Sequence, residues 1–209
     1  MNHISHKSIE RFCAYRRLLR TVRKTGVTNV YSHDLAEMSG GTAAQVRRDL
    51  MVIGCGGNPK TGYEVDDLLQ CFGDFLDNPD VESIALAGVG NLGRALLDFF
   101  SSHHPKLKIV ASFDVDPHKV GRVINGCRCY DIADVKSIIT DKKINVAILA
   151  VPADVAQSVA EKFADASVAG FLNFAPEPLR LPSRVIVENM DMTTALEKTV
   201  FLARQNSQT

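Results

Sequence analysis

The chain has 209 residues, of which 45% are hydrophobic and 23% charged, and its formal net charge is zero. This length suits two modest domains, and the composition is that of a globular protein. No apolar run approaches the ~20 residues that cross a bilayer, and the first residues lack the apolar core of a signal peptide. We therefore expect a cytoplasmic protein with no membrane partner.

The charge is distributed unevenly along the chain. Residues 1–60 hold ten Lys or Arg and four Asp or Glu, a formal charge of +6, which leaves −6 for the rest. A basic end joined to an acidic body indicates a polyanionic partner for the first part. By charge alone, however, a solvated basic helix face is the preferred explanation.

The sequence of residues 1–78 predicts three helices, a turn-rich loop with a strand, and a fourth helix. Apolar residues recur at helical spacing over 8–24, and Ser32 is placed to cap a short second helix. After the Gly40-Gly41 turn, Thr42 and Gln45 predict a capping box at the start of a third helix. A Gly-rich loop over 54–62, a strand over 63–65 and a helix over 66–78 follow.

This pattern is typical of a winged helix-turn-helix, whose third helix enters the major groove of DNA. With Val46, Leu50 and Ile53 facing inward, the other face of the third helix turns toward solvent. Arginine suits guanine edges and phosphates alike, and a wing lysine would contact phosphate or the minor groove. The predicted DNA-contacting residues are Ala44, Gln45, Arg47, Arg48, Met51, Lys60 and Tyr63. The alternative is a small helical cap that mediates packing.

From Val81 onward, short apolar runs alternate with amphipathic stretches. Strands are expected over 84–88, 108–114, 128–130, 145–151, 169–173 and 184–188, with helices between most of them. This alternation predicts an α/β domain with a doubly wound parallel sheet of the Rossmann type. We place the DNA-binding domain at 1–78, the Rossmann domain at 79–188 and a C-terminal segment at 189–209, with its helix at about 191–203.

The first strand of the second domain runs into a GxGxxG sequence that also opens a helix. This context makes the sequence a dinucleotide fingerprint. Gly88 would make the tight turn, Gly90 would let the backbone approach a pyrophosphate, and Gly93 would let the helix pack closely on the strand. Free amides at the helix start favour phosphates. The predicted phosphate-binding residues are Gly88, Val89, Gly90, Asn91, Leu92 and Gly93.

The second strand ends at Asp114, where a ribose-binding acid is expected. A carboxylate there accepts hydrogen bonds from a 2′-hydroxyl and repels a 2′-phosphate, which predicts NAD(H) rather than NADP(H). The alternative is that Asp114 caps the turn before Asp116. Val151 and Pro152, and likewise Asn173 and Phe174, follow later strands; lining the nicotinamide end and ordinary turn chemistry are equally good readings of both loops.

The cysteines predict no disulfide framework, because the chain is not short and holds an odd number, five. Cys127 and Cys129 are the one pair close in sequence. Their spacing is not a usual zinc pattern, so small buried thiols are preferred over metal or redox chemistry, and no metal is expected.

From about residue 8 to 204, the chain resembles the Rex family of redox-sensing bacterial repressors. The resemblance rests on the order and spacing of the segments 45–50, 62–65, 88–93, 113–117, 150–153, 173–176 and 187–191. It implies a homodimer that binds double-stranded operator DNA when NADH is scarce and is released when NADH binds. It also implies a C-terminal helix swapped into the partner subunit. Asp191 matches a family aspartate that reports the cofactor state from near the nicotinamide.

The chain departs from some family members at Phe99, where they carry a tyrosine that pairs with the aspartate. Met192 also stands where some carry phenylalanine, and the wing is less typical. The main alternative function, an NAD-dependent oxidoreductase, is disfavoured because only about twenty residues follow the last strand, too few for a substrate domain. No catalytic set stands out either. A third alternative is a nucleotide-sensing partner protein that does not bind DNA, for example one that binds coenzyme A.

Overall fold

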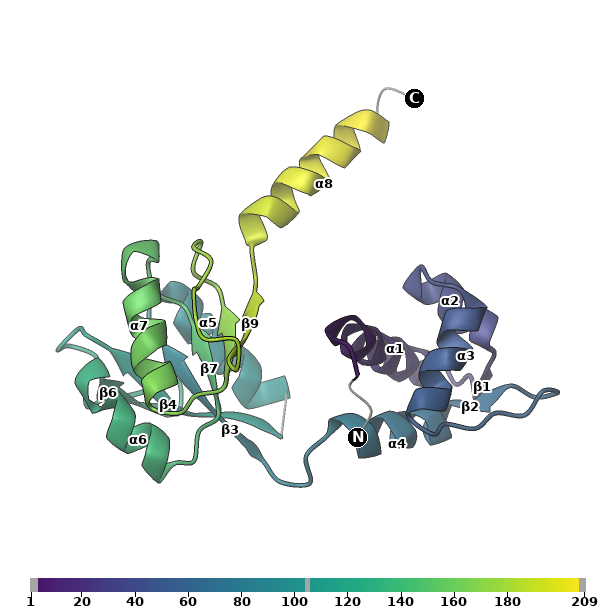
Figure 1. Ribbon diagram of the computed structural model, residues 1–209, viewed down its shortest axis with the longest axis horizontal. Coiled ribbons are helices and arrows are strands. Elements are labelled where there is room, and N and C mark those ends of the chain that lie inside the picture. Colours follow the sequence, from purple (N-terminus) through teal and green to yellow (C-terminus); the bar gives the residue numbers. More distant parts are fainter. Residues whose placement is uncertain (1–3, 104–105, 207–209) are drawn as a thin grey trace. The chain divides into compact units, whose positions relative to one another are not determined.

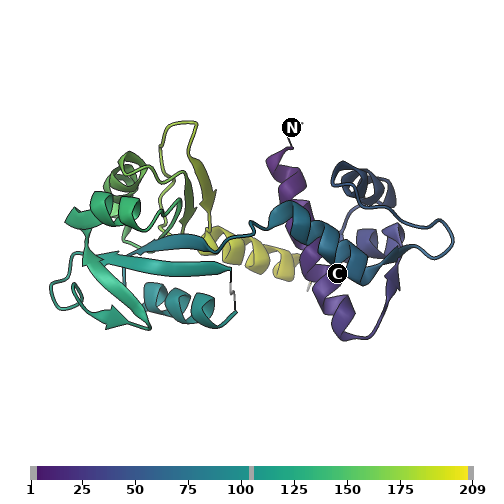
Figure 2. The ribbon, with the colours of Figure 1, turned by 90° about the horizontal axis from the view of Figure 1, so that it is seen from below.

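The computed structural model describes residues 4–103 and 106–206, and the chain divides into two compact units at Pro79 and Asp80 (Figures 1 and 2). Residues 1–3, at the start of the predicted DNA-binding domain, and residues 207–209, at the end of the predicted C-terminal segment, lie outside the described residues. Each unit has its own hydrophobic core, so each is described by itself.

The N-terminal unit is a winged helix. Its elements are α1 (His6–Lys24), β1 (Asn29–Val30), α2 (Ser32–Ser39), α3 (Ala43–Val52), β2 (Tyr63–Glu64) and α4 (Val65–Leu76). The two short strands pair antiparallel, with Asn29 opposite Glu64. The helices bury one apolar face each in a common core, whose fully buried side chains are Phe12, Leu19, Leu35, Val46, Leu50 and Phe72.

The helix starts differ from the sequence expectation in three details. Tyr31, not Ser32, is the N-cap of α2, because its backbone is extended and its carbonyl accepts the N–H of Leu35. The N–H of Tyr31 in turn donates to the Asp34 carboxylate at 2.7 Å. Thr42 caps α3 as predicted, accepting from the Gln45 N–H at 3.2 Å, but the Gln45 side chain donates to Asp49 and leaves the capping box half formed. Val65 begins α4 and does not extend the strand.

The C-terminal unit contains a seven-stranded sheet. Its strands are β3 (Glu82–Ala87), β4 (Leu107–Asp114), β5 (Val123–Ile124), β6 (Cys127–Asp131), β7 (Val146–Leu149), β8 (Gly170–Asn173) and β9 (Ile186–Asn189). They lie in the order β5-β6-β4-β3-β7-β8-β9, and all neighbours are parallel except β5 and β6. The six parallel strands have the doubly wound order of a Rossmann fold, which confirms the predicted fold class of this domain.

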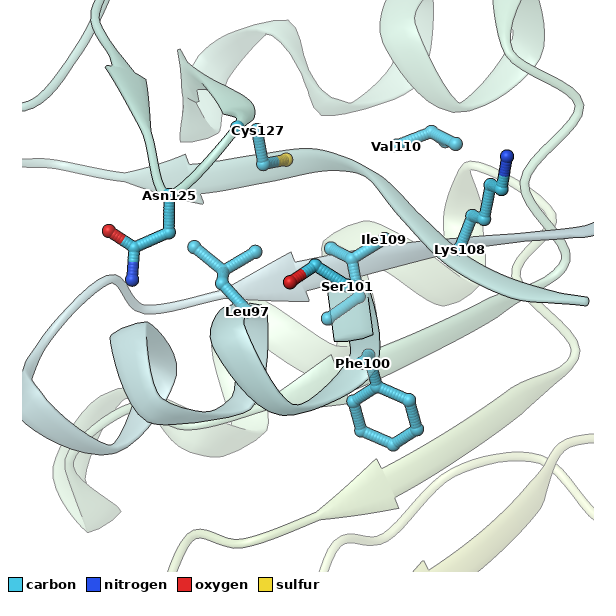
Figure 3. Close-up of a pocket in the computed structure, with 9 residues that line it drawn as sticks. Leu97, Phe100, Ser101, Lys108, Ile109, Val110, Asn125 and Cys127 are labelled. Atoms are coloured by element: carbon cyan, nitrogen blue, oxygen red, sulfur yellow. The ribbon is translucent and has the colours of Figure 1, made fainter. Parts of the chain in front are cut away.

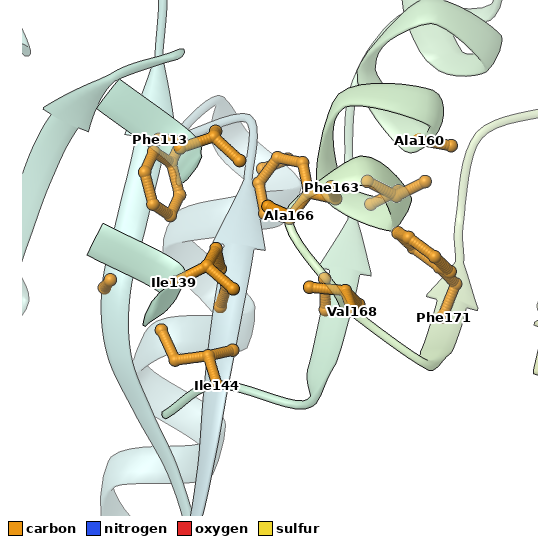
Figure 4. Packing of buried hydrophobic residues seen from close by; sticks show 14 residues of the cluster. Phe113, Ile139, Ile144, Ala160, Phe163, Ala166, Val168 and Phe171 are labelled. Atoms are coloured by element: carbon orange, nitrogen blue, oxygen red, sulfur yellow. The ribbon is translucent and has the colours of Figure 1, made fainter. Parts of the chain in front are cut away.

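Helices cover both faces of this sheet. They are α5 (Asn91–His103), η1 (Ile132–Asp134), α6 (Val135–Asp141) and α7 (Ala153–Asp165). Alternate residues of each strand face opposite sides. Thus Ala87 and Leu149 join Phe113 and Phe163 in the core on the α6 and α7 side (Figure 4), while Leu86 packs into the core that includes α5.

The last helix, α8 (Met192–Asn206), follows β9 and extends away from the sheet in Figure 1. None of its residues is buried, although several are large and apolar: Met192, Leu196, Val200, Phe201 and Leu202. No helix in the described ranges is long and apolar enough to cross a membrane.

Candidate functional site

The glycine-rich turn between β3 and α5 has the geometry that its spacing predicts. Gly88 has a φ of +89°, in the region that favours glycine, and a Cβ there would collide with the Ala150 carbonyl oxygen. A Cβ on Gly93 would collide with the Gly88 carbonyl oxygen, so α5 approaches the turn only because residue 93 lacks a side chain. These two glycines therefore hold the turn itself in shape.

Gly90 differs from these two because a Cβ there would meet no atom within 4 Å. The turn is thus open at Gly90, where a phosphate can approach the backbone. Asn91 and Leu92 begin α5, whose first N–H groups have no partner within the helix. Open backbone, unpaired amides and the positive end of the helix dipole together fit a pyrophosphate.

Asp114, at the end of β4, lies directly beside this turn. Its Oδ1 accepts the backbone N–H groups of Val115 (2.9 Å) and Asp116 (3.0 Å). Its Oδ2 accepts the N–H of Val89 (2.9 Å) and the ammonium of Lys119 (3.0 Å). A carboxylate has about four acceptor positions, and here all four are filled. Three of the donors are backbone groups, so Lys119 is the partner that a side-chain rotation can remove.

Burial by itself raises the pKa of Asp114, but the N–H groups of Asp116 and Val89 and the ammonium of Lys119 outweigh it and hold the pKa below its usual value. Asp114 is therefore ionised at neutral pH, as a ribose acceptor needs to be. The predicted alternative, a cap on the turn before Asp116, is also present, since the N–H of Asp116 is one of its donors. The carboxylate that caps this turn is therefore the same one that is predicted to accept the ribose hydroxyl.

The other predicted cofactor residues fall into two groups. Val151 is half-buried and Pro152 is the exposed N-cap of α7, at the same end of the sheet as the glycine turn. Asn173 is buried, and its side chain joins three segments: it donates to the Glu177 carbonyl and Asn189 Oδ1 and accepts from the Ala175 N–H. These bonds favour the turn-chemistry reading for Asn173.

Phe174 and Asp191, the last two predicted cofactor residues, follow the strands β8 and β9. Phe174 packs at the edge of the α5-side core. Asp191 caps α8, accepting from the Thr194 N–H at 2.9 Å and the Thr194 hydroxyl at 2.6 Å. The Thr194 hydroxyl and N–H lower the pKa of the exposed Asp191 carboxyl. Asp191 therefore starts the helix that no described residue of its own unit covers.

A separate groove of about 430 Å³ lies between α5 and the β5–β6 hairpin (Figure 3). It is lined by Leu97, Phe100, Ile109, Asn125 and Cys127, among others. The connection from β4 to β6 carries the short strand β5 and no helix, so this part of the sheet face has no helical cover. None of the predicted cofactor residues lines the groove, and it is a different place from the nucleotide turn.

In the N-terminal unit, α3 presents the residues predicted to contact DNA. Ala44, Arg48 and Met51 are exposed, and Met51 is 73% exposed. Arg47 is exposed too, but its guanidinium donates to the Ser32 hydroxyl at 3.0 Å and so links α3 to α2. Gln45 is half-buried and directed at Asp49. Of the two arginines, Arg48 is held by no hydrogen bond or ion pair to a described residue.

A polar cluster behind α3 was missed by the sequence analysis. Asp49 is buried and accepts two hydrogen bonds from Arg11 (2.6 and 2.8 Å), one from Tyr15 (3.1 Å) and one from Gln45 (2.8 Å). Burial by itself raises the pKa of Asp49, but the hydrogen bonds from Arg11 and Gln45 outweigh this effect, so the pKa lies below its usual value. The available signal was an acid three residues after Val46 on the inward face of a predicted amphipathic helix, a position that requires partners.

The wing extends from Cys55 to Gly62. Asn58 and Gly62 exchange two backbone hydrogen bonds of 2.8 Å each, and the Tyr31 hydroxyl donates to the Lys60 carbonyl oxygen at 2.9 Å. Lys60 is exposed, whereas the half-buried Tyr63 ring packs against Gly57 so closely that a Cβ there would collide with it. Tyr63 thus shapes the wing from within, and Lys60 is on its surface.

The cysteines pair differently from their spacing in sequence. Cys55 and Cys71 form a disulfide, while Cys127 and Cys129 are buried free thiols on β6. Burial raises the pKa of both β6 thiols, as expected of small buried residues. Among the described residues, no group of three or more His, Cys, Asp or Glu is arranged to hold a metal ion.

Comparisons with known proteins agree with both units. A family model described as a putative DNA-binding protein N-terminus matches residues 3–50, and one described as a CoA binding domain matches residues 80–177. The redox-sensing transcriptional repressor Rex of Lactobacillus acidophilus is 35% identical over 198 residues, which are 95% of this chain and 94% of that protein. The Rex of Listeria welshimeri is 36% identical, covering 95% and 92%. This chain belongs to the Rex family.

Solved structures of a Rex-family repressor, RSP, match the same chain throughout. RSP alone is 28% identical, with a TM-score of 0.88 over 100% of this chain and 97% of that one. It has also been solved with β-NADH (28% identity, TM-score 0.87, covering 100% and 98%) and with β-NAD⁺ and operator DNA (29%, 0.88, covering 100% and 96%). The family resemblance and the winged-helix and Rossmann fold expected from the sequence are confirmed.

Proposed function

We propose that this Rex-family chain is a redox-sensing transcriptional repressor. It binds operator DNA through the winged helix when NADH is scarce and releases it when NADH binds the Rossmann unit. The proposal rests on one observation: a single chain contains both kinds of site. Its Rossmann unit has a glycine turn, Gly88 to Gly93, with the proposed ribose acid Asp114 beside it, and its winged helix has an exposed arginine on α3. The RSP complexes, one with NADH and one with NAD⁺ and DNA, support both halves.

In this proposal the nucleotide is held mainly by the backbone. The N–H groups at the start of α5 bind the pyrophosphate at Gly90, where the approach is open. For Asp114 to accept a ribose hydroxyl, one of its four donors has to leave, and Lys119 is the only side chain among them. We infer that Lys119 fills the ribose position in the free protein and moves aside when NAD(H) binds.

The DNA face is α3 with the wing. Arg48 and Met51 face the bases or backbone in the major groove, and Lys60 contacts phosphate from the wing. Behind them, Asp49 and its partners hold α3 against α1, so that the exposed side chains start from a fixed helix. Arg47 likewise holds α3 against α2 through its hydrogen bond to Ser32.

The homodimer and its helix exchange are also proposals. The apolar side chains of α8 are 41–65% exposed within one chain, which is costly for a helix that remains uncovered. A second copy of the chain that receives α8, as the family resemblance implies, would cover them. Asp191 at the start of α8 and Phe99 on α5 are then the residues that we expect near the subunit contact.

Switching requires two dimer arrangements with different NADH affinities, because a ligand with equal affinity for both shifts nothing. NADH has to bind the DNA-free arrangement more tightly, and by linkage operator DNA then weakens NADH binding by the same factor. We infer a regulator and not an oxidoreductase, since its curated relatives are repressors over nearly their full lengths. It would act in the cytoplasm, where the bacterial chromosome lies.

The test is a fluorescence anisotropy titration with a labelled duplex that the NAD⁺-loaded protein selects from random-sequence DNA. We expect NADH, and not NAD⁺, to release the duplex, and calorimetry to show weaker NADH binding when the duplex is present. DNA binding that ignores both nucleotides would overturn the sensing half of the proposal. If the protein binds NADH tightly but selects no DNA, the repressor proposal is wrong, and the enzyme and the partner protein that does not bind DNA become the preferred functions.

A further inference from the structure

The disulfide between Cys55 and Cys71 lies at the base of the wing, and the proposed function does not use it. Cys55 follows the Gly54 turn that ends α3, and its N–H donates to the Leu50 carbonyl at 2.9 Å. Cys71 lies on α4, sixteen residues further along the chain. The bond therefore closes a covalent ring that contains the whole wing, β2 and the first part of α4.

The reduced form of this site is also well accommodated. The sulfur of Cys71 lies 3.7 Å from the Ile53 carbonyl oxygen, which would accept a hydrogen bond from the thiol. Cys55 is 8% exposed and packs in the apolar core of the unit, where a small thiol fits as well as a bonded sulfur. The Ile53 carbonyl is thus an acceptor already in place for a Cys71 thiol, which favours opening of the bond without unfolding of the unit.

The remaining cysteines lack this arrangement. Cys127 and Cys129 are buried, and burial raises their pKa, which makes the reactive thiolate scarce. Cys13 is exposed on α1 and is a free thiol. Disulfides inside cells are usually transient and redox-sensing, because the cytoplasm keeps thiols reduced. A bonded pair in an intracellular repressor is therefore a candidate for reversible modification.

We propose that Cys55 and Cys71 are a reversible thiol–disulfide site, oxidised by low-molecular-weight disulfides, that fixes the wing and strengthens operator binding. This inference rests on the proposed repressor function. The non-covalent contacts of the wing are few: the two-residue strands, the Asn58–Gly62 pairing, and hydrogen bonds from Tyr31 to the Lys60 carbonyl and from Asn29 to the Thr61 carbonyl. A covalent bond across its base therefore restricts it most. Restricting a segment before it binds reduces the entropy lost on binding.

The chemistry balances with a disulfide oxidant, RSSR. Cys71, which is half-buried and the more accessible of the two, attacks one sulfur as the thiolate; the S–S bond of RSSR breaks, one RS⁻ leaves and takes up a proton. Cys55 then attacks the sulfur of Cys71, the Cys55–Cys71 bond forms, and the second RSH leaves. Two protein thiols are oxidised and one RSSR is reduced to two RSH; a dithiol reductant reverses the step.

The direction of this effect agrees with the nucleotide signal. Oxidising conditions lower NADH and, in the proposal, favour the DNA-bound repressor. The same conditions close the Cys55–Cys71 bond and strengthen DNA binding through the wing. The two inputs act on different units of the chain but on the same outcome.

The experiment is anisotropy of the full-length protein with the selected duplex, after equilibration in glutathione buffers of graded GSH/GSSG ratio and without nucleotide. Maleimide labelling and intact mass count the free thiols of each sample. We expect the oxidised protein to bind about fivefold more tightly than the reduced protein, as ordering a few wing residues in advance would give. Cys71→Ser and Cys55→Ala should both bind like the reduced protein at every ratio, and Cys13→Ser like the unchanged chain.

NADH affinity, measured in the same buffers, is the internal control and should not change. The inference would be overturned if the thiols of Cys55 and Cys71 stay free at every glutathione ratio, or if the oxidised and reduced proteins bind DNA equally. Either result would leave NADH-controlled repression intact. Failure of the protein to select any DNA would overturn the proposed function and this inference together. If Cys55→Ala and Cys71→Ser still respond to glutathione, the responsive thiol is another cysteine and the assignment is wrong.

Discussion

Each unit of this chain holds an aspartate that accepts four hydrogen bonds, but the donors differ, and of the two only Asp49 is buried. Asp49, behind the DNA-facing helix, is held by the side chains of Arg11, Tyr15 and Gln45. Asp114, beside the nucleotide turn, is held by three backbone N–H groups and by Lys119. Arg11 and Tyr15 lie on α1, whereas Gln45 lies on α3 with Asp49, so releasing Arg11 or Tyr15 loosens α1 against α3. Asp114 can exchange Lys119 without disturbing the backbone.

The difference separates a carboxylate that joins two helices from one that we propose to bind the nucleotide. In that proposal a ligand competes for Asp114 at the cost of one partly buried ion pair, with Lys119, whereas nothing can compete for Asp49 without separating two packed helices. This comparison predicts which substitutions lower stability, which lower nucleotide affinity and which do both.

The largest effect is expected from Asp49→Ala. It leaves the partly buried Arg11 and Tyr15 without their acceptor, which costs about 3 kcal/mol, at the low end for a broken buried pair because Arg11 is 34% exposed. Hydrogen exchange on the full-length protein should show α1 and α3 opening more readily by this amount, with β3 and β4 unchanged. Unchanged protection in α3 would mean that Asp49 is not structural.

Two glycine variants distinguish support of the turn from contact with ligand. Gly93→Ala places a methyl group against the Gly88 carbonyl oxygen and should cost about 2 kcal/mol of Rossmann-unit stability in addition to NADH affinity. Gly90→Ala adds its methyl group to open space and should leave the melting temperature unchanged while weakening NADH at least tenfold. Equal NADH affinity in Gly90→Ala would remove this residue from the pyrophosphate site.

Arg48→Ala should weaken operator binding about tenfold, within the range for loss of one arginine contact, and leave NADH affinity intact. Arg47→Ala is the matched control, because its guanidinium is already bonded to Ser32. We expect Arg47→Ala to lower stability slightly and DNA affinity less than Arg48→Ala does. Anisotropy at two salt concentrations measures both variants, and an undiminished affinity for Arg48→Ala would place this residue outside the interface.

Lys119→Met tests the exchange at Asp114. Removing the ammonium frees one acceptor position of the carboxylate, so NADH should bind up to a few-fold more tightly, and NADPH less well relative to NADH, since an unscreened Asp114 repels a 2′-phosphate more strongly. Asp114→Ala should show the opposite pattern, with weak NADH binding and relaxed discrimination. Calorimetry with both nucleotides decides; identical ratios in Lys119→Met would show that Lys119 does not occupy the ribose position.

The smallest effect concerns pH. The pKa of Asp49 is lower in the folded protein than its usual value, so its stabilisation is complete above that value and is lost as the pH falls through the lowered pKa. We expect α1 and α3 to lose protection against exchange below about pH 4, where an unperturbed aspartate is about half protonated. Asp49→Asn should not show this acid-dependent loss, and an equally steep loss in that variant would assign it to other carboxylates.

Much of the nucleotide site was predictable from the sequence. The turn depends on residues close together in the chain, and glycine at 88, 90 and 93 has consequences that follow from backbone geometry alone. Asp114 was predictable because a parallel strand of ordinary length brings a residue about twenty positions later back to the same sheet edge. Helix α3 of the N-terminal unit and its exposed face were predictable in the same way, from the spacing of apolar residues.

The contacts that join distant segments were not predictable. The buried cluster at Asp49 needs Arg11 and Tyr15, which lie 38 and 34 residues away, and the occupation of Gln45 follows from it. Asn173, predicted near the nicotinamide with ordinary turn chemistry as the alternative, is bonded within its own loop and to β9. The pairing of cysteines was hidden for the same reason, since Cys127 and Cys129 are neighbours on one strand and Cys55 and Cys71 are neighbours only in space.

The sequence by itself thus determined the two folds, the glycine turn, the place of Asp114 beside that turn and the family, because each depends on local spacing and on the order of segments. Tertiary structure alone decided which polar side chains are already occupied: Asp49 by Arg11, Asp114 by Lys119, Cys71 by Cys55. The physical reason is that a side chain's partners depend on packing between elements, whereas backbone conformation depends mainly on neighbours along the chain.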